Sequence, residues 1–120
     1  MPRSPGPPHS RPLDITVAIQ DHHAVLALSG EIDASNAPDI VLHADQGLGQ
    51  PGVSHLTADL SGVIFIDSSG IQALVFCRGH ALRQGKTFQI EGQRGQVAKI
   101  LEAVGIAELL TNPAFTTDPP

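Results

Sequence analysis

The residues best suited to chemistry are Asp67, Ser68 and Ser69, followed by Gly70, at the point where an apolar run ends. Residues 63–66 are apolar and β-prone, and apolar residues return after Gly70 at helical spacing, so the segment predicts a strand, a turn and a helix. Asp and Ser oxygens accept hydrogen bonds from the free amide groups of a helix start. A serine hydroxyl there tolerates a phosphate, because a helix N-terminus favours negative charge. The pattern is therefore suited to a phosphorylation switch.

Nucleophilic catalysis is an alternative use of the same serines, with one of the six histidines as the base. A nucleophile elbow requires a glycine two residues before the serine and another two residues after it, and neither Ser68 nor Ser69 has the first of these. The only Gly-Lys pair, Gly85 and Lys86, follows a predicted helix, whereas a phosphate-binding loop follows a strand. The sequence therefore favours a protein that is not an enzyme and uses no cofactor.

Two carboxylates, Asp33 and Asp67, each close an apolar strand or loop and precede a predicted helix. Helix capping alone accounts for both, since Asp is a favoured N-cap residue. A functional role requires them to converge beside the serines, which neighbouring parallel strands ending at one sheet edge allow. Both interpretations stay open at this level.

Composition and charge restrict the partners of the chain. A net charge of −5 with only seven Lys and Arg argues against a nucleic acid partner, and four Phe without Trp or Tyr give little aromatic surface for base stacking. No run of eighteen apolar residues and no signal-peptide pattern are present, so neither membrane insertion nor secretion is expected. The single cysteine, Cys77, lies in an apolar helical run and is predicted to pack in the core, which fits a reducing cytoplasm.

The histidines do not follow a metal-binding motif. His22 and His23 are adjacent in a predicted turn, where side chains of extended neighbours diverge. His43, His55 and His80 fall in separate elements. We therefore expect no metal site, and we expect surface or half-buried positions for these side chains.

The remaining pattern predicts, in chain order, a hairpin of strands 15–20 and 24–28, a loop 30–33, a helix from Ser35 or Asn36 to Gly47 and Gly49, a strand 55–60, a turn 61–62, a strand 63–66, a helix ended by Gly85, a strand 87–91, a helix 97–104 and one apolar turn or edge at 106–110. This order predicts an α/β fold with a mixed, mostly parallel sheet of about four or five strands and helices mainly on one face. One domain is expected over residues 13–110, flanked by Pro-rich tails 1–12 and 111–120.

Three segments together resemble the STAS domain of anti-sigma factor antagonists: Gly-Glu-Ile-Asp at 30–33, Asp-Leu-Ser-Gly-Val at 59–63 and Ile-Asp-Ser-Ser-Gly-Ile at 66–71. The resemblance covers about Leu13 to Leu110 and implies a single STAS-like domain. In that family the serine directly after the Asp is phosphorylated by a serine kinase that is also an anti-sigma factor. The resemblance therefore implies Ser68 as the acceptor, with Ser69 as the fallback.

The resemblance also implies a set of residues near the phosphorylation site or at the partner interface, namely Asp33, Asp67, Ser69, Gly70 and Gln72. The family continues after the glycine with Leu-Gly, where this chain has Ile71 and Gln72. A polar residue thus replaces a small one on the helix expected to face the kinase.

The function implied by the resemblance is that of a cytoplasmic bacterial regulator of transcription. The unphosphorylated chain would bind the kinase and release a sigma factor, and phosphorylation at Ser68 would switch this binding off. Neither direct contact with nucleic acid nor insertion into a membrane is implied. The alternative is a STAS module of another assembly, of the lipid-transport or stressosome type, that binds a different protein.

Overall fold

The computed structural model describes residues 11–112, so most of the two predicted tails lies outside the described residues. The elements within this range are β1 (Asp14–Gln20), β2 (His23–Ile32), α1 (Ala37–Leu48), β3 (His55–Ile66), α2 (Ser68–Arg83), β4 (Thr87–Glu91), α3 (Gly95–Ala103) and α4 (Ala107–Thr111). The described strands form one sheet in the order β1-β2-β3-β4, with β1 antiparallel to β2 and the other pairs parallel. The predicted α/β fold with a mixed, mostly parallel sheet is confirmed.

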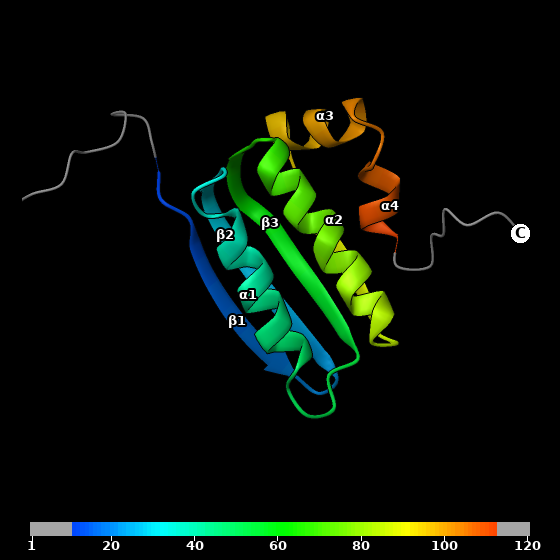
Figure 1. Ribbon diagram of the computed structural model, residues 1–120. Helices are drawn as coiled ribbons and strands as arrows, with labels where there is room; N and C mark the ends of the chain where they lie inside the picture. The colour runs from blue at the N-terminus through cyan, green and yellow to red at the C-terminus, as the bar shows by residue number, and fades with distance from the viewer. Residues whose placement is uncertain (1–10, 113–120) are drawn as a thin grey trace, which may run out of the picture.

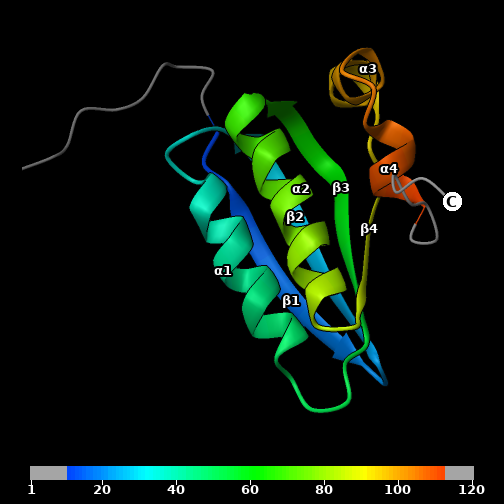
Figure 2. The same ribbon diagram turned by 45° about the vertical axis from the view of Figure 1, so that its right-hand side comes forward.

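The helices divide into two groups (Figures 1 and 2). α1 and α2 lie side by side across one face of the sheet, while α3 packs against β3 and α4 against β4. Every second residue of a strand points to the same face, and the helix-covered face of the sheet carries the apolar set. The fully buried large side chains are Leu26, Leu28, Ile32, Ile40, Leu48, Leu56, Leu60, Ile66, Leu74, Phe88, Ile90 and Leu101. The core is therefore aliphatic except for Phe88.

The β1–β2 hairpin is confirmed and turns at Asp21 and His22, between the paired residues Gln20 and His23. Asp21 has a φ of 57°, a left-handed conformation that Asp tolerates better than most residues. The hairpin sets the two histidines apart. His22 is exposed with its Nδ1 2.8 Å from the Gly52 carbonyl oxygen, whereas His23 begins β2.

Two sequence predictions about the central strands are wrong. Residues 30–32 are not a loop, because β2 continues through Ile32, and of the predicted loop only Asp33 lies outside the strand. Residues 61–62 are not a turn, because β3 runs without interruption over twelve residues. A Ser-Gly pair is typical of turns, but here hydrogen bonding to β2 carries the chain through it.

The Ser61-Gly62 pair forms an irregularity inside β3. Ala27 of β2 pairs with Asp59 of β3, and Ser29 pairs with Gly62. Between these two pairs the chain advances by two residues in β2 but by three in β3. The extra residue of β3 is the signature of a β-bulge. A Cβ on Gly62 would lie 2.6 Å from the Ser29 Cβ, so the two strands approach too closely there for any other residue.

The helices α1 and α2 begin and end near the capping, proline and glycine residues that the sequence predicts. α1 has Asn36 as N-cap, Pro38 in its first turn and Gly49 as C-cap, and α2 ends before Gly85, whose φ is 73°. α3 begins two residues earlier than predicted. The predicted apolar turn at 106–110 is the short helix α4, which extends one residue into the predicted C-terminal tail.

Two further residues bear on the sequence predictions. Cys77 is buried in α2, and burial raises the pKa of its thiol to about 12, so it packs as predicted. Arg11, in the predicted N-terminal tail, is tied to the end of β2. Its backbone N–H donates to a carboxylate oxygen of Glu31 at 3.1 Å, and its carbonyl accepts from the Glu31 N–H at 3.2 Å.

Candidate functional site

Asp67 joins the end of β3 to the start of α2. It is the N-cap of α2, and its Oδ1 accepts hydrogen bonds from the backbone N–H groups of Ser69 at 2.9 Å and Gly70 at 3.2 Å. Its own N–H donates to the Ile32 carbonyl at 3.2 Å, which extends the ladder between the two central strands by one bond. Asp67 is thus the helix cap that sequence reasoning allowed, and its carboxylate holds the serine turn in place.

The two serines occupy different environments at this helix start. Ser68 is the first residue of α2 and is exposed, whereas Ser69 is half-buried. A group added to the Ser68 hydroxyl therefore enters solvent at the positive end of a sixteen-residue helix.

Gly70 has a packing role. It is buried, and a Cβ at this position would lie 2.5 Å from Ile32 Cγ2 and 2.7 Å from Ile66 Cγ1. The glycine therefore lets the first turn of α2 rest directly on the ends of the two central strands. It fixes where Asp67 and the serines stand relative to the sheet.

Asp33 shapes the loop that leads into α1. Its Oδ1 accepts from the Ser35 hydroxyl at 2.5 Å and from the Ser35 N–H at 2.9 Å. The hydrogen bond from the Ser35 hydroxyl is the main reason that the pKa of Asp33 lies below its ordinary value. Asn36 completes the loop, because its side chain accepts from the Asp33 N–H and donates to the Glu31 carbonyl.

The two acidic residues lie at the same end of the sheet, where β2 and β3 finish. Ile32 of β2 and Ile66 of β3 are paired, and Asp33 and Asp67 are the residues that directly follow them. This is the arrangement that the functional interpretation of the carboxylates requires. The hydrogen bonds of each carboxylate are nevertheless local, to Ser35 for Asp33 and to the first turn of α2 for Asp67.

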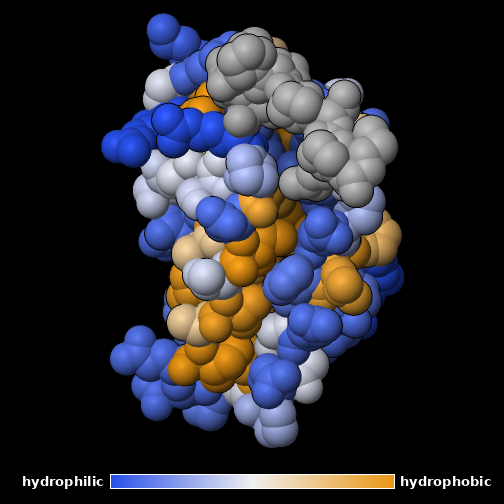
Figure 3. Space-filling view, turned by 90° about the vertical axis from the view of Figure 1, so that its left-hand side faces the viewer, coloured by the Kyte–Doolittle hydropathy of each residue, from blue (hydrophilic) through white to orange (hydrophobic). Residues whose placement is uncertain are grey.

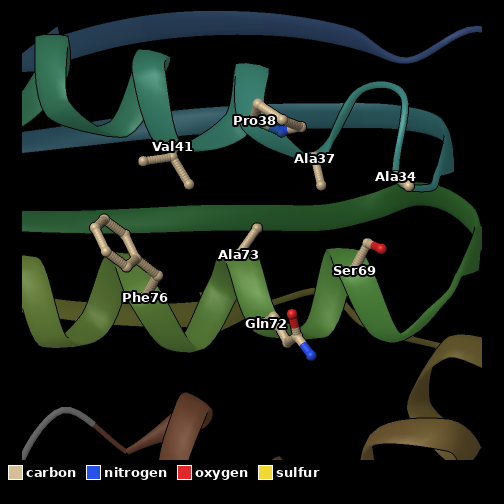
Figure 4. Close-up of a pocket in the computed structure, with 8 residues that line it drawn as sticks. All are labelled: Ala34, Ala37, Pro38, Val41, Ser69, Gln72, Ala73 and Phe76. Atoms are coloured by element: carbon tan, nitrogen blue, oxygen red, sulfur yellow. The ribbon is translucent and has the colours of Figure 1, made fainter.

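A groove of about 520 Å³ between α1 and α2 opens beside this end of the sheet (Figure 4). The α1 side is lined by Ala34, Ala37, Pro38 and Val41, and the α2 side by Ser69, Gln72, Ala73 and Phe76. Most of the lining is apolar. The Ser69 and Gln72 side chains bring hydrogen-bonding groups to the end of the groove nearest the serine turn (Figure 4).

Phe76 is the largest exposed apolar side chain of this groove, with 49% of its surface accessible. Its ring stacks on His80, and the Arg83 guanidinium lies 5.7 Å from the ring centroid. Sequence reasoning did not assign a role to Phe76 or to the α1 wall. The available signal was the run Leu74-Val75-Phe76, which holds more apolar residues than one buried helix face needs.

Of the predicted site residues, the structure brings Asp33, Asp67 and both serines to the same end of the sheet. Gln72 is exposed on α2 and lines the groove. Gly70 is buried below them.

The other candidate groups lie elsewhere. His43 and His80 bond to α1 atoms, and His55 is half-buried on the sheet. Within residues 11–112, no group of three or more His, Cys, Asp or Glu side chains could hold a metal ion. None of the helices in this part of the chain combines the length and apolar character needed to span a membrane.

Solved structures of known proteins share this architecture. An anti-sigma factor antagonist from Mycobacterium paratuberculosis is 25% identical, with a TM-score of 0.71 over 87% of this chain and 86% of that one. The anti-sigma factor antagonist SpoIIAA in its unphosphorylated form is 16% identical, with a TM-score of 0.70 over 85% and 89% of the two chains. The murine anion transporter Slc26a9 is 21% identical, with a TM-score of 0.63, over 74% of this chain but only 15% of the transporter.

A sequence model of the family described as "Mlab, STAS domain" matches residues 15–111. Apart from Asp14, the first residue of β1, this range includes all the strands and helices described above, together with the serine turn and the groove. The chain therefore belongs to the STAS domain family.

Proposed function

We propose that this protein is an anti-sigma factor antagonist that binds a serine-kinase anti-sigma factor and is switched off by phosphorylation at Ser68. The observation that carries the proposal is the position of Ser68. It is exposed at the first residue of α2, directly after the capping Asp67, and lies next to an apolar groove. The likeness to two solved anti-sigma factor antagonists supports the same function.

In this proposal the unmodified chain docks on the kinase through the start of α2 and the groove between α1 and α2. The apolar groove walls and the exposed Phe76 supply contact area, and Gln72 supplies a hydrogen-bonding group near the serines. Occupation of the kinase frees the sigma factor that it otherwise holds. The chain acts by binding and carries out no catalysis of its own, and such a kinase would be met in a bacterial cytoplasm.

Phosphorylation reverses this binding through charge. A phosphate adds about −1.5 to −2 charges at neutral pH. The phosphate is added at the end of the sheet that already carries Asp33 and Asp67, in a chain of net charge −5. The free chain keeps this charge in water at a helix N-terminus, where it is tolerated, but a partner surface would strip the water away. The switch therefore acts on the complex and leaves the fold intact.

The test uses the full chain with its cognate kinase and ATP. We expect one phosphoryl group in the intact mass, mapped to Ser68 by fragmentation, and loss of the modification in Ser68→Ala. Ser69→Ala is the matched control, one residue away on the same turn, and should still be modified. Modification that survives in Ser68→Ala and disappears in Ser69→Ala would move the acceptor to Ser69.

Calorimetric titration against the kinase then measures the switch itself. Phosphorylation should weaken the affinity by at least about tenfold, since a buried and unpaired charge costs several kcal/mol. Equal affinities for the two forms would contradict partner switching, because a partner that does not discriminate between two states is not controlled by them.

The second candidate is a STAS module of another assembly, of the lipid-transport or stressosome type. The likeness to 15% of the Slc26a9 anion transporter supports it, because it shows the same fold as a small part of a much larger protein. Purification of the chain from its source cells with its bound proteins separates the two. A kinase among the bound proteins favours the antagonist, and transport or scaffold components favour the module.

A further inference from the structure

The outer side of β1 is an open sheet edge. Within residues 11–112 no other strand pairs with it, and its pairing with β2 is regular over all seven residues. In an edge strand every second residue turns its N–H and C=O groups away from the sheet, ready to pair with another strand. Edge strands are usually protected by Lys, Pro or a bulge. β1 has none of these, and its sequence Asp-Ile-Thr-Val-Ala-Ile-Gln carries one charge, at its first residue.

The helix-facing side of this strand is apolar and partly open to solvent. Val17 and Ile19 expose 38% and 44% of their surfaces, and Ile15 is half-buried. Figure 3 views the molecule from the side of β1 and shows a hydrophobic strip with hydrophilic margins. A recess of about 190 Å³ lies between Val17, Ile19 and the last turn of α1. Such a strip beside unpaired backbone groups is typical of a strand that receives a partner strand.

We propose that a second copy of this chain pairs with β1 in antiparallel orientation, about a twofold axis at Val17, to form one continuous sheet across two chains. An interface about a twofold axis uses the same surface on both copies, so the strand must be complementary to itself. With Val17 opposite Val17, the remaining pairs are Asp14 with Gln20, Ile15 with Ile19, and Thr16 with Ala18.

The sequence of β1 satisfies this requirement. Directly opposed residues of an antiparallel pair share a face, so the three Ile and Val side chains of each copy meet those of the other on the helix-covered side. Asp14 of each copy lies opposite the neutral Gln20. A parallel pairing would instead place Asp14 beside Asp14, and like charges opposite each other are destabilising. The charge pattern therefore selects the antiparallel dimer.

The dimer also fills the recess and leaves the serine turn free. Ile15 of the second copy, opposite Ile19, enters the space that Ile19 and the end of α1 enclose. β1 contributes no residue to the groove between α1 and α2. A dimer of this kind presents two grooves and two Ser68 side chains at once, and it does not depend on the proposed function of that site.

Sedimentation velocity of the full chain over a range of concentrations tests the proposal. We expect a species of twice the 12.6 kDa chain mass that dissociates on dilution. Val17→Lys and Val17→Glu should each weaken the dimer at least about tenfold, because each places like charges on the twofold axis. An equimolar mixture of the two variants should restore it, because the opposed residues then carry opposite charges.

Val104→Lys is the matched control, because Val104 is 53% exposed at the end of α3 and takes no part in β1. It should dimerise as the parent does. Circular dichroism checks that each variant is folded. A parent chain that is monomeric at every concentration overturns the proposal, whether β1 stays open or is covered by another protein or by another part of the chain. A mixture of the Lys and Glu variants that stays monomeric overturns the axis at Val17.

Discussion

Gly70 lies against Ile32 so closely that a Cβ on the glycine would come within 2.5 Å of the isoleucine Cγ2. This contact joins the first turn of α2 to the last residue of β2. The stabilities of the serine turn and of the sheet are therefore coupled at a single residue.

Gly70→Ala should destabilise the fold by about 1–3 kcal/mol, because the added methyl group forces the helix off the two strand ends. Urea unfolding followed by circular dichroism measures the change. Gly79→Ala, in the same helix, is the control. The nearest atom to a Cβ there is the movable end of Arg83, and Ala gains roughly 0.5–1 kcal/mol over Gly inside a helix. Equal effects of the two substitutions would contradict the close approach of Gly70 to the sheet.

Ser68→Asp should keep the fold and raise stability slightly, by roughly 0.3–1 kcal/mol, because an acid at the first residue of a helix interacts favourably with its N-terminus. Thermal unfolding compares it with the parent chain and with Ser68→Asn, which has a similar size and no charge. A fall of several degrees in the midpoint would mean that the hydroxyl packs in the core, against its exposure in the structure.

The Asp33 loop should contribute to stability only where Asp33 is ionised. The Ser35 hydroxyl lowers the pKa of Asp33 below its ordinary value of 3.8 in the folded chain. A carboxyl whose pKa is lower in the folded chain stabilises the fold at pH values above its pKa in the unfolded chain. This contribution is lost as the pH falls through its pKa in the folded chain. The unfolding free energy of the parent should therefore exceed that of Ser35→Ala near neutral pH, and the two should converge below pH 3.8. A difference that is independent of pH would contradict the charge-dependent hydrogen bond.

His23 and His55 share one hydroxyl on the sheet face that α1 and α2 leave uncovered. They are paired across β2 and β3, their ring centroids are 4.7 Å apart, and the Nε2 atoms lie 2.7 and 3.3 Å from Oγ1 of the buried Thr57. Burial, and then the neighbouring His23, lower the pKa of His55 from its ordinary value of 6.5, while Glu91 opposes the shift. The unfolded chain thus binds more protons than the folded one as the pH falls below 6.5.

The unfolding free energy of the parent should accordingly decrease as the pH is lowered from 6.5 towards the pKa of His55 in the folded chain. His55→Gln should make this decrease smaller. Glu91→Gln is the matched variant with the opposite expectation. It removes the charge that holds the pKa of His55 up, so the decrease should become steeper. Denaturant titrations across this pH range measure both effects, and an unchanged slope in His55→Gln would show that another group controls the titration.

The sequence predicts most elements of the fold because their signals are local. The β1–β2 hairpin follows from alternating apolar residues, and the end of α2 follows from Gly85, which adopts the left-handed conformation that only glycine adopts freely. The continuity of β3 through Ser61 and Gly62 was missed. Local chemistry favours a turn there, and the bulge exists because β2 supplies a partner 32 or more residues away.

The candidate site likewise has features that local sequence predicts and features that it does not. The Asp67 cap and the exposed Ser68 follow from residue types at a strand-to-helix junction. The groove could not be predicted, because it depends on how α1 lies against α2 across the sheet. The meeting of His23 and His55 depends on strand register, which no local pattern in either segment specifies.

The order of the strands in the sheet equals their order in the chain, and this has a consequence for synthesis on the ribosome. Each strand that leaves the ribosome finds its neighbour already made, so β2 closes on β1, β3 docks on β2 and β4 on β3. Translation at roughly 5–20 residues per second leaves ample time for each step. β1, in contrast, emerges first, and within residues 11–112 no later strand pairs with its outer side. In the proposed dimer, β1 of one chain is therefore available to a second copy before the rest of either chain has been made.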